Sequence, residues 1–131
     1  MNIHLEYKHA LVCGASKGIG KAIAFALAEA GASVTLVARN AEELADIMTR
    51  LPQNSHAHHQ FIAADFNNPE DVQKKIHQLV LHKSVDILIN NTGGPPAGMA
   101  IDAEPAAFEL AFRQHLICNQ VLVKLVVPGM K

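Results

Sequence analysis

Three closely spaced glycines follow a short apolar run near the start of the chain. The run ends at Cys13, and Gly14, Gly18 and Gly20 lead into an alanine-rich segment, an order that predicts a strand, a tight turn and a helix. Such a turn aims unpaired N–H groups of the helix N-terminus outward, and glycine, without a Cβ, lets a pyrophosphate approach closely. The spacing Gly-x-x-x-Gly-x-Gly differs from the commonest dinucleotide fingerprint, so a nucleotide cradle is at this point a hypothesis.

Short apolar runs alternate with segments of helical spacing along the chain. The runs typical of buried strands are 10–13, 33–38, 61–65 and 85–90. The helical segments are 18–30, 41–51, one that begins at 68–71, and one from 105 to about 127. Strands that alternate with helices imply right-handed crossovers and a parallel sheet covered on both faces. We therefore predict an α/β doubly wound sheet in one domain.

Composition excludes several classes of function. The 131 residues are 50% hydrophobic and carry a net charge of −1, without the basic stripe that nucleic acid or a membrane surface would need. Cys13 and Cys118 lie in apolar segments, as reduced core cysteines of a cytoplasmic protein do. The N-terminus has no targeting core, and polar residues interrupt the last apolar segment, so no membrane association is expected.

Informative residues stand at the carboxyl ends of the four expected strands, where a doubly wound sheet forms its ligand crevice. These residues are Gly14, Arg39, Asp65 and Asn90. An acid after the second strand suits a free ribose 2′-hydroxyl, whereas a guanidinium suits a 2′-phosphate. With Arg39 there and Lys17 in the glycine turn, the sequence predicts NADP(H) rather than NAD(H). The alternative is that both are ordinary solvated charges.

The four strand ends together resemble the short-chain dehydrogenase/reductase family in its classical NADP(H)-preferring form. The resemblance rests on Gly14-x-x-x-Gly18-x-Gly20, Arg39, Asp65 and Asn90-Asn91-Thr92-Gly93, and it covers essentially the whole chain. It implies a Rossmann-type sheet with strand order 3-2-1-4. Residues 1–131 would be the dinucleotide-binding, N-terminal part of a longer single-domain protein, without the family's C-terminal strands.

The resemblance also implies cofactor contacts, taken over position by position. The adenosine 2′-phosphate would be surrounded by Ser16, Lys17, Arg39 and Asn40, and the pyrophosphate would be bound by the N–H of Ile19, in the turn formed by Gly14, Gly18 and Gly20. The Asp65 carboxylate would bind the adenine amino group. The ribose would be lined by the backbone of Asn91, Thr92 and Gly93. Asn90 would be mainly structural.

Catalysis is where the sequence departs from the family. The resemblance implies hydride transfer in which a Tyr-x-x-x-Lys pair exchanges a proton with the carbonyl or alcohol. The only tyrosine here is Tyr7, ahead of the first strand, and the chain ends at Lys131, before that segment would begin. We therefore expect these residues to be inactive alone. His115 occupies the family's asparagine position, either as holder of a relay water or as a packed helix residue.

Two other features bear on metal binding and on oligomer formation. His56, His58 and His59 share one loop, but no cysteine or acid converges on them, so no metal is predicted. The last helix, about 105–127, is apolar over more of its surface than one buried stripe requires. By resemblance this predicts a homodimer or homotetramer contact. The alternative is that further strands and helices of a longer chain cover it.

Three functions remain open from the sequence. The leading hypothesis is an NADP(H)-dependent oxidoreductase that acts on a small-molecule carbonyl or alcohol substrate, with these residues supplying cofactor binding. The second is a non-catalytic or degenerate NADP-binding or assembly module that lacks the Tyr-x-x-x-Lys pair. The third, a nucleotide-fold methyltransferase, would want an acid after the second strand for the ribose hydroxyls, and Arg39 argues against it.

Overall fold

A four-stranded parallel sheet organises the chain. The structure is a computed structural model that describes residues 3–91, 104–112 and 116–130. Its strands are β1 (His9–Cys13), β2 (Ser33–Ala38), β3 (Gln60–Ala63) and β4 (Ile87–Ile89), in the order β3-β2-β1-β4 with every pairing parallel. The predicted fold class and strand order are therefore confirmed.

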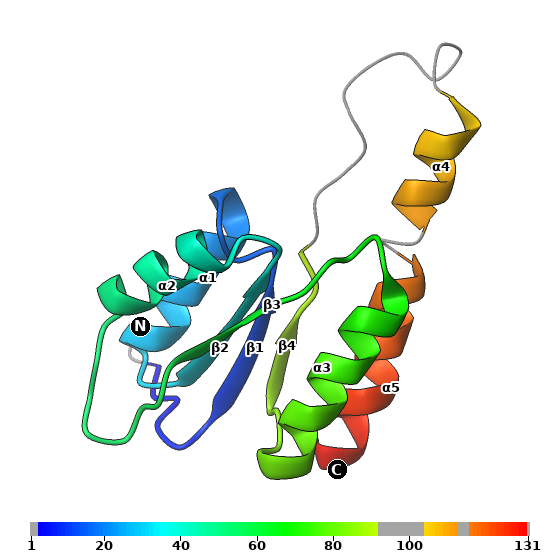
Figure 1. The fold of residues 1–131 in the computed structure, drawn as a ribbon. Coiled ribbons are helices and arrows are strands. Elements are labelled where there is room, and N and C mark those ends of the chain that lie inside the picture. Colours follow the sequence, from blue (N-terminus) through cyan, green and yellow to red (C-terminus); the bar gives the residue numbers. More distant parts are fainter. Residues whose placement is uncertain (1–2, 92–103, 113–115, 131) are drawn as a thin grey trace.

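Helices cover both faces of the sheet. Helices α1 (Gly18–Glu29) and α2 (Ala41–Arg50) lie on one face, and α3 (Pro69–His82) and α5 (Cys118–Met130) lie on the other (Figure 1). Strand β1 is buried along its whole length because alternate residues serve the two cores. Val12 packs toward α1 and α2, whereas Leu11 packs with Ile76 of α3 and Leu122 of α5. Two apolar layers thus hold the central strand in place.

Side-chain caps and one glycine set the helix boundaries close to their predicted positions. Asn40 accepts hydrogen bonds from the N–H groups of Glu42 and Glu43 at the start of α2. Asn68 caps α3 in the same way. Helix α1 ends before Gly31, whose φ of +106° is readily adopted only by glycine. These local signals bring the chain back to the sheet after each helix.

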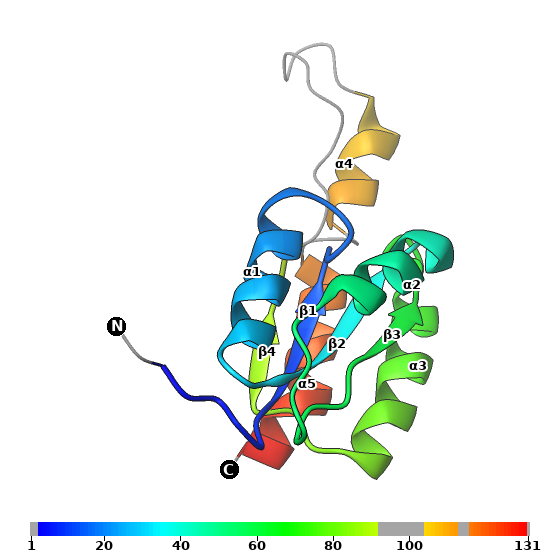
Figure 2. The same cartoon turned by 90° about the vertical axis from the view of Figure 1, so that its left-hand side faces the viewer.

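The last predicted helix differs from the structure. Instead of one helix over 105–127, the described residues contain α4 (Pro105–Phe112) and α5, and residues 113–115 lie outside the description. Helix α5 also continues past Pro128, the predicted stop. Proline removes one N–H donor and crowds the preceding turn, but here only two helical residues follow it, so the disruption is confined to the helix end. Helix α4 lies beyond the carboxyl ends of the strands (Figures 1 and 2).

Strand β4 is shorter than the predicted run 85–90, and Asp86 lies directly before its first residue. Its carboxylate accepts a hydrogen bond from the N–H of His9 at 2.8 Å, and its own N–H donates to the His9 carbonyl at 2.8 Å. These two bonds pin the amino ends of β1 and β4 together. No helix in the described part of the chain combines the length and apolar character needed to cross a bilayer.

His9 is a buried histidine that the sequence did not single out. Its Nδ1 lies 2.9 Å from the Ser84 carbonyl oxygen, which can only accept, so Nδ1 carries the proton. Nε2 then accepts from the Thr35 hydroxyl at 2.6 Å. Burial lowers the pKa of His9 below its usual 6.5, and the charge of Lys83 adds to this against the opposing effects of Ser84 and Asp86. The neutral ring is therefore part of the core.

We expect the free energy of unfolding to fall as the pH drops below about 6.5, because the unfolded chain then binds a proton that native His9 resists. The slope from one such group approaches about 1.4 kcal/mol per pH unit. Urea unfolding between about pH 7.5 and pH 5 measures it. A His9→Gln variant should show a shallower slope, whereas the exposed control His77→Gln should keep the wild-type slope. Equal slopes in both variants would contradict this role of His9.

Candidate functional site

The carboxyl ends of the parallel strands meet at one edge of the sheet (Figure 2). At this edge the chain leaves β1 into the glycine turn, β2 at Arg39, β3 toward Asp65 and β4 toward Asn91. The topology therefore brings together four segments that are far apart in sequence. Because crossovers enter and leave at this edge, it is where doubly wound sheets bind ligands.

Gly14 and Gly20 permit close packing of the chain on itself. Gly14 has a φ of +66°, and a Cβ there would lie 1.6 Å from the Asn91 carbonyl oxygen. A Cβ on Gly20 would lie 2.1 Å from the Gly14 carbonyl oxygen. The N–H groups of Gly14 and Ala15 both donate to the Val37 carbonyl, at 2.9 and 3.3 Å. These two glycines therefore bring β1, β2 and the segment after β4 together.

Gly18 differs from the other two glycines because its surroundings are open. Its φ is +56°, and no atom of the other described residues lies within 4 Å of the position that a Cβ would take. Lys17 forms the N-cap of α1 with an extended backbone and no side-chain cap, and no acidic residue stands in the first turn. Ile19 is 71% exposed. The start of α1 thus presents uncapped N–H groups and positive dipole to solvent, as an anion site requires.

Basic and amide side chains flank this helix start. Arg39 and Asn40 are exposed directly after β2, Lys17 is exposed and Ser16 is half-buried in the glycine turn. Within the described residues, neither Arg39 nor Lys17 forms an ion pair. The Asn40 side-chain oxygen is already occupied as the cap of α2, at 3.0 and 3.1 Å from two N–H groups. Only its amide nitrogen remains to donate to a phosphate.

The loop after β3 holds Asp65 through its own backbone. The Asp65 N–H donates to Asp71 Oδ2 at 3.1 Å, and Asp65 Oδ1 accepts from the Asn67 N–H at 2.9 Å. The Asp65 carbonyl accepts from the Asn68 N–H at 2.9 Å. One carboxylate oxygen of Asp65 is thus used within the loop, and no other described residue bonds to Oδ2, which can accept from a ligand. Sequence reasoning used Asn68 and Asp71 only to predict the start of α3, and it did not predict that Asp71 would bond to Asp65.

The segment after β4 is described only as far as Asn91. Asn90 is exposed, whereas Asn91 is half-buried and approaches the Gly14 and Gly20 backbone through its carbonyl oxygen and side-chain amide. The predicted ribose contacts Thr92 and Gly93 and the predicted relay residue His115 lie outside the described residues. The structure therefore brings Asn91 to the glycine turn.

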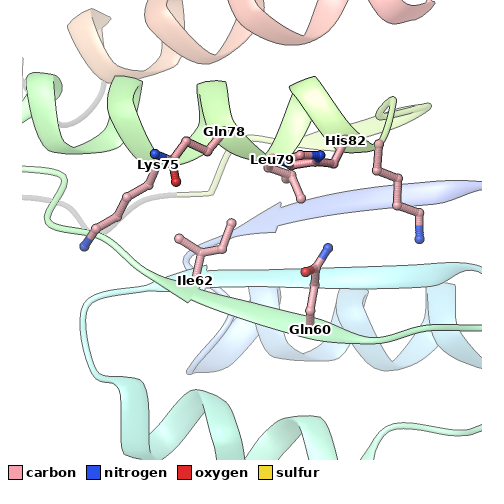
Figure 3. Close-up of a pocket in the computed structure, with 7 residues that line it drawn as sticks. Gln60, Ile62, Lys75, Gln78, Leu79 and His82 are labelled. Atoms are coloured by element: carbon pink, nitrogen blue, oxygen red, sulfur yellow. The ribbon is translucent and has the colours of Figure 1, made fainter.

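Two hollows on the surface lie away from the predicted cofactor residues. Figure 3 shows a groove of about 490 Å³ between α3 and the edge strand β3, lined by Gln60, Ile62, Lys75, Gln78, Leu79, His82 and Lys83. A second hollow of about 300 Å³ is lined by Leu5, Lys8, Asp86, Ile87 and Met130. Neither contains a residue of the glycine turn or a strand-end residue predicted to bind the cofactor.

Two of the loop histidines make side-chain contacts within the fold. His59 Nδ1 accepts from the Val34 N–H at 3.1 Å, and Nε2 donates to the Pro52 carbonyl at 2.8 Å. His56 packs against Tyr7 with ring centroids 4.6 Å apart. In the described ranges, no group of three or more histidine, cysteine or acidic side chains is placed to hold a metal ion. Both ring nitrogens of His59 therefore serve the fold.

The cysteines lie together in the core under the carboxyl edge. Cys13 and Cys118 are free, buried and part of one apolar cluster. Burial raises the pKa of Cys13 to about 12, with a smaller contribution from Cys118. Burial likewise raises the pKa of Cys118 to about 11, with a smaller contribution from the charge of Asp65. Both side chains are therefore protonated thiols at neutral pH.

We expect neither thiol to react with iodoacetamide in the native protein at about pH 8, because the thiolate fraction is below about one in a thousand and access is blocked. Both should be alkylated quickly in urea. Mass spectrometry after timed labelling measures this. Native labelling at the rate seen in urea would contradict the buried placement.

The parallel sheet, its crossover helices and the glycine turn at the carboxyl edge define the doubly wound class of nucleotide-binding folds. Residues 8–131 match the family model for short chain dehydrogenase. The chain belongs to the short-chain dehydrogenase family. The glycine turn, Arg39, Asp65 and Asn91 all fall within this match.

Relatives with names are similar over most of the chain. A versicolorin reductase of Emericella nidulans is 36% identical over 86% of this chain and 43% of its own length. A rhamnolipids biosynthesis 3-oxoacyl-[acyl-carrier-protein] reductase of Pseudomonas aeruginosa is 40% identical over 89% of this chain and 47% of its own. The inactive hydroxysteroid dehydrogenase-like protein 1 of Homo sapiens is 30% identical over 92% of this chain and 37% of its own.

Solved structures share the fold. The L-sorbose reductase of Gluconobacter frateurii, complexed with NADPH and L-sorbose, is 28% identical with a TM-score of 0.88, covering 99% of this chain and 50% of that one. A metagenomic short-chain oxidoreductase in complex with NADP is 28% identical with a TM-score of 0.82, covering 99% of this chain and 58% of that one. The chain thus spans about half the length of the proteins it resembles.

Proposed function

We propose that residues 1–131 form the dinucleotide-binding part of an NADP(H)-dependent oxidoreductase, within a longer single-domain protein that acts on a small-molecule carbonyl or alcohol. One observation carries the proposal: the strand order puts the uncapped start of α1, Arg39 and Asp65 at a single edge of the sheet. The binding of NADPH and NADP by the similar structures named above supports the choice of cofactor.

The proposed site divides the cofactor among the strand ends. The N–H groups at the start of α1, Ile19 among them, bind the pyrophosphate, and Gly18 leaves room for it to approach. Arg39 and Lys17 pair with the 2′-phosphate, assisted by Ser16 and the Asn40 amide nitrogen. The free oxygen of Asp65 accepts from the adenine amino group. Asn91, Thr92 and Gly93 line the ribose. The bound nicotinamide would supply hydride transfer.

An alternative function is supported by a specific observation. A relative named as inactive, the hydroxysteroid dehydrogenase-like protein 1 of Homo sapiens, is similar over 92% of this chain. The second proposal is therefore a non-catalytic NADP-binding or assembly module. Val123, exposed on α5, and Leu116, exposed two residues before α5, are the residues we assign to its oligomer contact.

An activity assay separates the two proposals. The intact mass of the natural protein is measured first, and NADPH oxidation is then followed with a panel of aldehydes and ketones. Turnover with any carbonyl compound, together with a mass above that of 131 residues, supports the oxidoreductase. Saturable NADPH binding without turnover supports the non-catalytic module. Absence of NADPH binding overturns both proposals.

A further inference from the structure

The loop between β3 and α3 is short and is held from two helices. It comprises residues 64–68, with Ala64 buried and its N–H donating to the Ala38 carbonyl at 2.9 Å. Asp65 is half-buried at the carboxyl edge of the sheet. Two side chains from outside the loop bond to its backbone on either side of the Asp65–Phe66 peptide: Asp71 from α3 and Cys118 from α5.

The contact from α3 is an ionised acceptor held in place by a lysine. Asp71 Oδ2 accepts from the Asp65 N–H at 3.1 Å and lies 3.3 Å from Lys75 Nζ. Lys75 in turn donates to the Ala63 carbonyl, and Figure 3 shows it extending from α3 toward the end of β3. The hydrogen bond from Asp65 and the neighbouring lysine lower the pKa of Asp71, so it stays ionised at neutral pH. Charge-assisted bonds of this kind are stronger than neutral ones.

The contact from α5 is a buried thiol. Cys118 Sγ donates to the Phe66 carbonyl at 3.1 Å, although the two residues are 52 positions apart. Its side chain is 0% exposed and packs in the same cluster as Ala64, Val72 and Ile76. Since the thiol is protonated at neutral pH, it remains a donor there. Water cannot replace it at a fully buried position.

The two contacts restrict how Asp65 presents its carboxylate. Asp71 holds the backbone N–H of Asp65, and Cys118 holds the carbonyl of the next residue, Phe66. The Asn67 N–H occupies Oδ1, so the orientation of Oδ2 follows from the backbone. Recognition of a single donor group depends on such preorganisation, because a shift of about 1 Å removes most of a hydrogen bond.

We propose that Asp71 and Cys118 are positioning residues that aim Asp65 at the adenine amino group and so determine selectivity for adenine over a 6-oxo purine. This inference rests on the proposed function, because it takes the carboxyl edge as the cofactor site. Lys75 supports it by holding Asp71. The observation behind it is that two helices packed on the same face of the sheet bond to two consecutive residues of one loop, Asp65 and Phe66.

The test compares two ligands that differ only at the adenine. NADPH carries the 6-amino group, and reduced nicotinamide hypoxanthine dinucleotide phosphate carries a carbonyl oxygen there, which would face the Asp65 carboxylate. Binding of both to the purified protein is followed by nucleotide fluorescence. We expect the wild type to favour NADPH by roughly tenfold or more, since the hypoxanthine oxygen leaves Asp65 without a donor.

Paired variants identify the positioning role. Asp71→Ala and Cys118→Val should each reduce the preference to about twofold or less, with binding of the hypoxanthine ligand nearly unchanged. Asp71→Asn and Cys118→Ser keep an acceptor and a donor, so they should retain most of the preference. Asp46→Ala is the matched control, because Asp46 forms an i,i+4 ion pair with Arg50 at 3.2 Å on α2. A general loss of stability would weaken both ligands alike.

Each outcome decides the matter. Full preference retained in both Asp71→Ala and Cys118→Val overturns the positioning role while the proposed function stands. A wild type that binds both ligands equally overturns the assignment of Asp65 and this inference with it. A wild type that binds neither overturns the proposed function itself. Asp71 and Cys118 lie on different helices. If a variant at one of these positions fails to fold, the two variants at the other position still test the proposal.

Discussion

Replacing Gly14 by alanine is expected to lower the free energy of unfolding by more than about 3 kcal/mol. The added Cβ would lie 1.6 Å from the Asn91 carbonyl oxygen, and the φ of +66° is unfavourable for any residue with a Cβ. Relief requires moving the backbone after β1, an inner strand of the sheet, or after β4, the edge strand that pairs with it. Urea unfolding followed by circular dichroism measures the loss.

Gly18→Ala is the matched control for this effect. Its φ of +56° imposes similar backbone strain, but in the described part of the chain no atom outside its neighbours lies within 4 Å of the new Cβ. We expect a loss of about 1–2 kcal/mol from the left-handed conformation alone. If Gly14→Ala were no more destabilising than Gly18→Ala, the close approach of Asn91 to the turn would be contradicted.

Replacing Arg39 by aspartate is expected to weaken NADPH binding by about 10- to 100-fold and to leave NADH binding equal or tighter. The substitution removes a charge-assisted bond worth about 1.5–3 kcal/mol and adds a repulsive carboxylate. Within the described residues Arg39 has no ion-pair partner, so the native fold loses no ion pair. Isothermal titration with both nucleotides measures the change.

Arg50→Asp provides the same change of charge elsewhere. Arg50 is exposed in the last turn of α2, where it pairs with Asp46 at 3.2 Å. A general electrostatic effect on an anionic ligand would appear in both variants. A ratio of NADPH to NADH affinity that is unchanged in Arg39→Asp, or changed as much in Arg50→Asp, would remove Arg39 from the proposed 2′-phosphate site.

The sheet was predictable because its signals are local. Each apolar run lies between turn residues, and the side chains that cap α2 and α3, Asn40 and Asn68, stand immediately before the helical spacing begins. Right-handed crossovers then leave few ways to order parallel strands. The family resemblance narrowed these to the order that the structure has.

The features that sequence reasoning missed depend on distant partners. His9 is bonded to Thr35 and Ser84, which are 26 and 75 residues away, and the predicted strand begins one residue after it, at Ala10. Cys118 was predicted only as a core residue. Its hydrogen-bond acceptor is the carbonyl oxygen of Phe66, which lies far away in the sequence, in the loop between β3 and α3. The role of Asn40 also needed the structure, since an asparagine side chain suits both a helix cap, through its oxygen, and a phosphate shell, through its amide nitrogen, until the backbone is known.

The central claim is that the carboxyl edge binds NADP(H) through its 2′-phosphate, and titration of the protein with NADPH, NADH and 2′,5′-ADP tests it most directly. We predict saturable NADPH binding at least about tenfold tighter than that of NADH, with 2′,5′-ADP competing for the same site. No saturable NADPH binding, or equal affinity for NADPH and NADH, would contradict the claim.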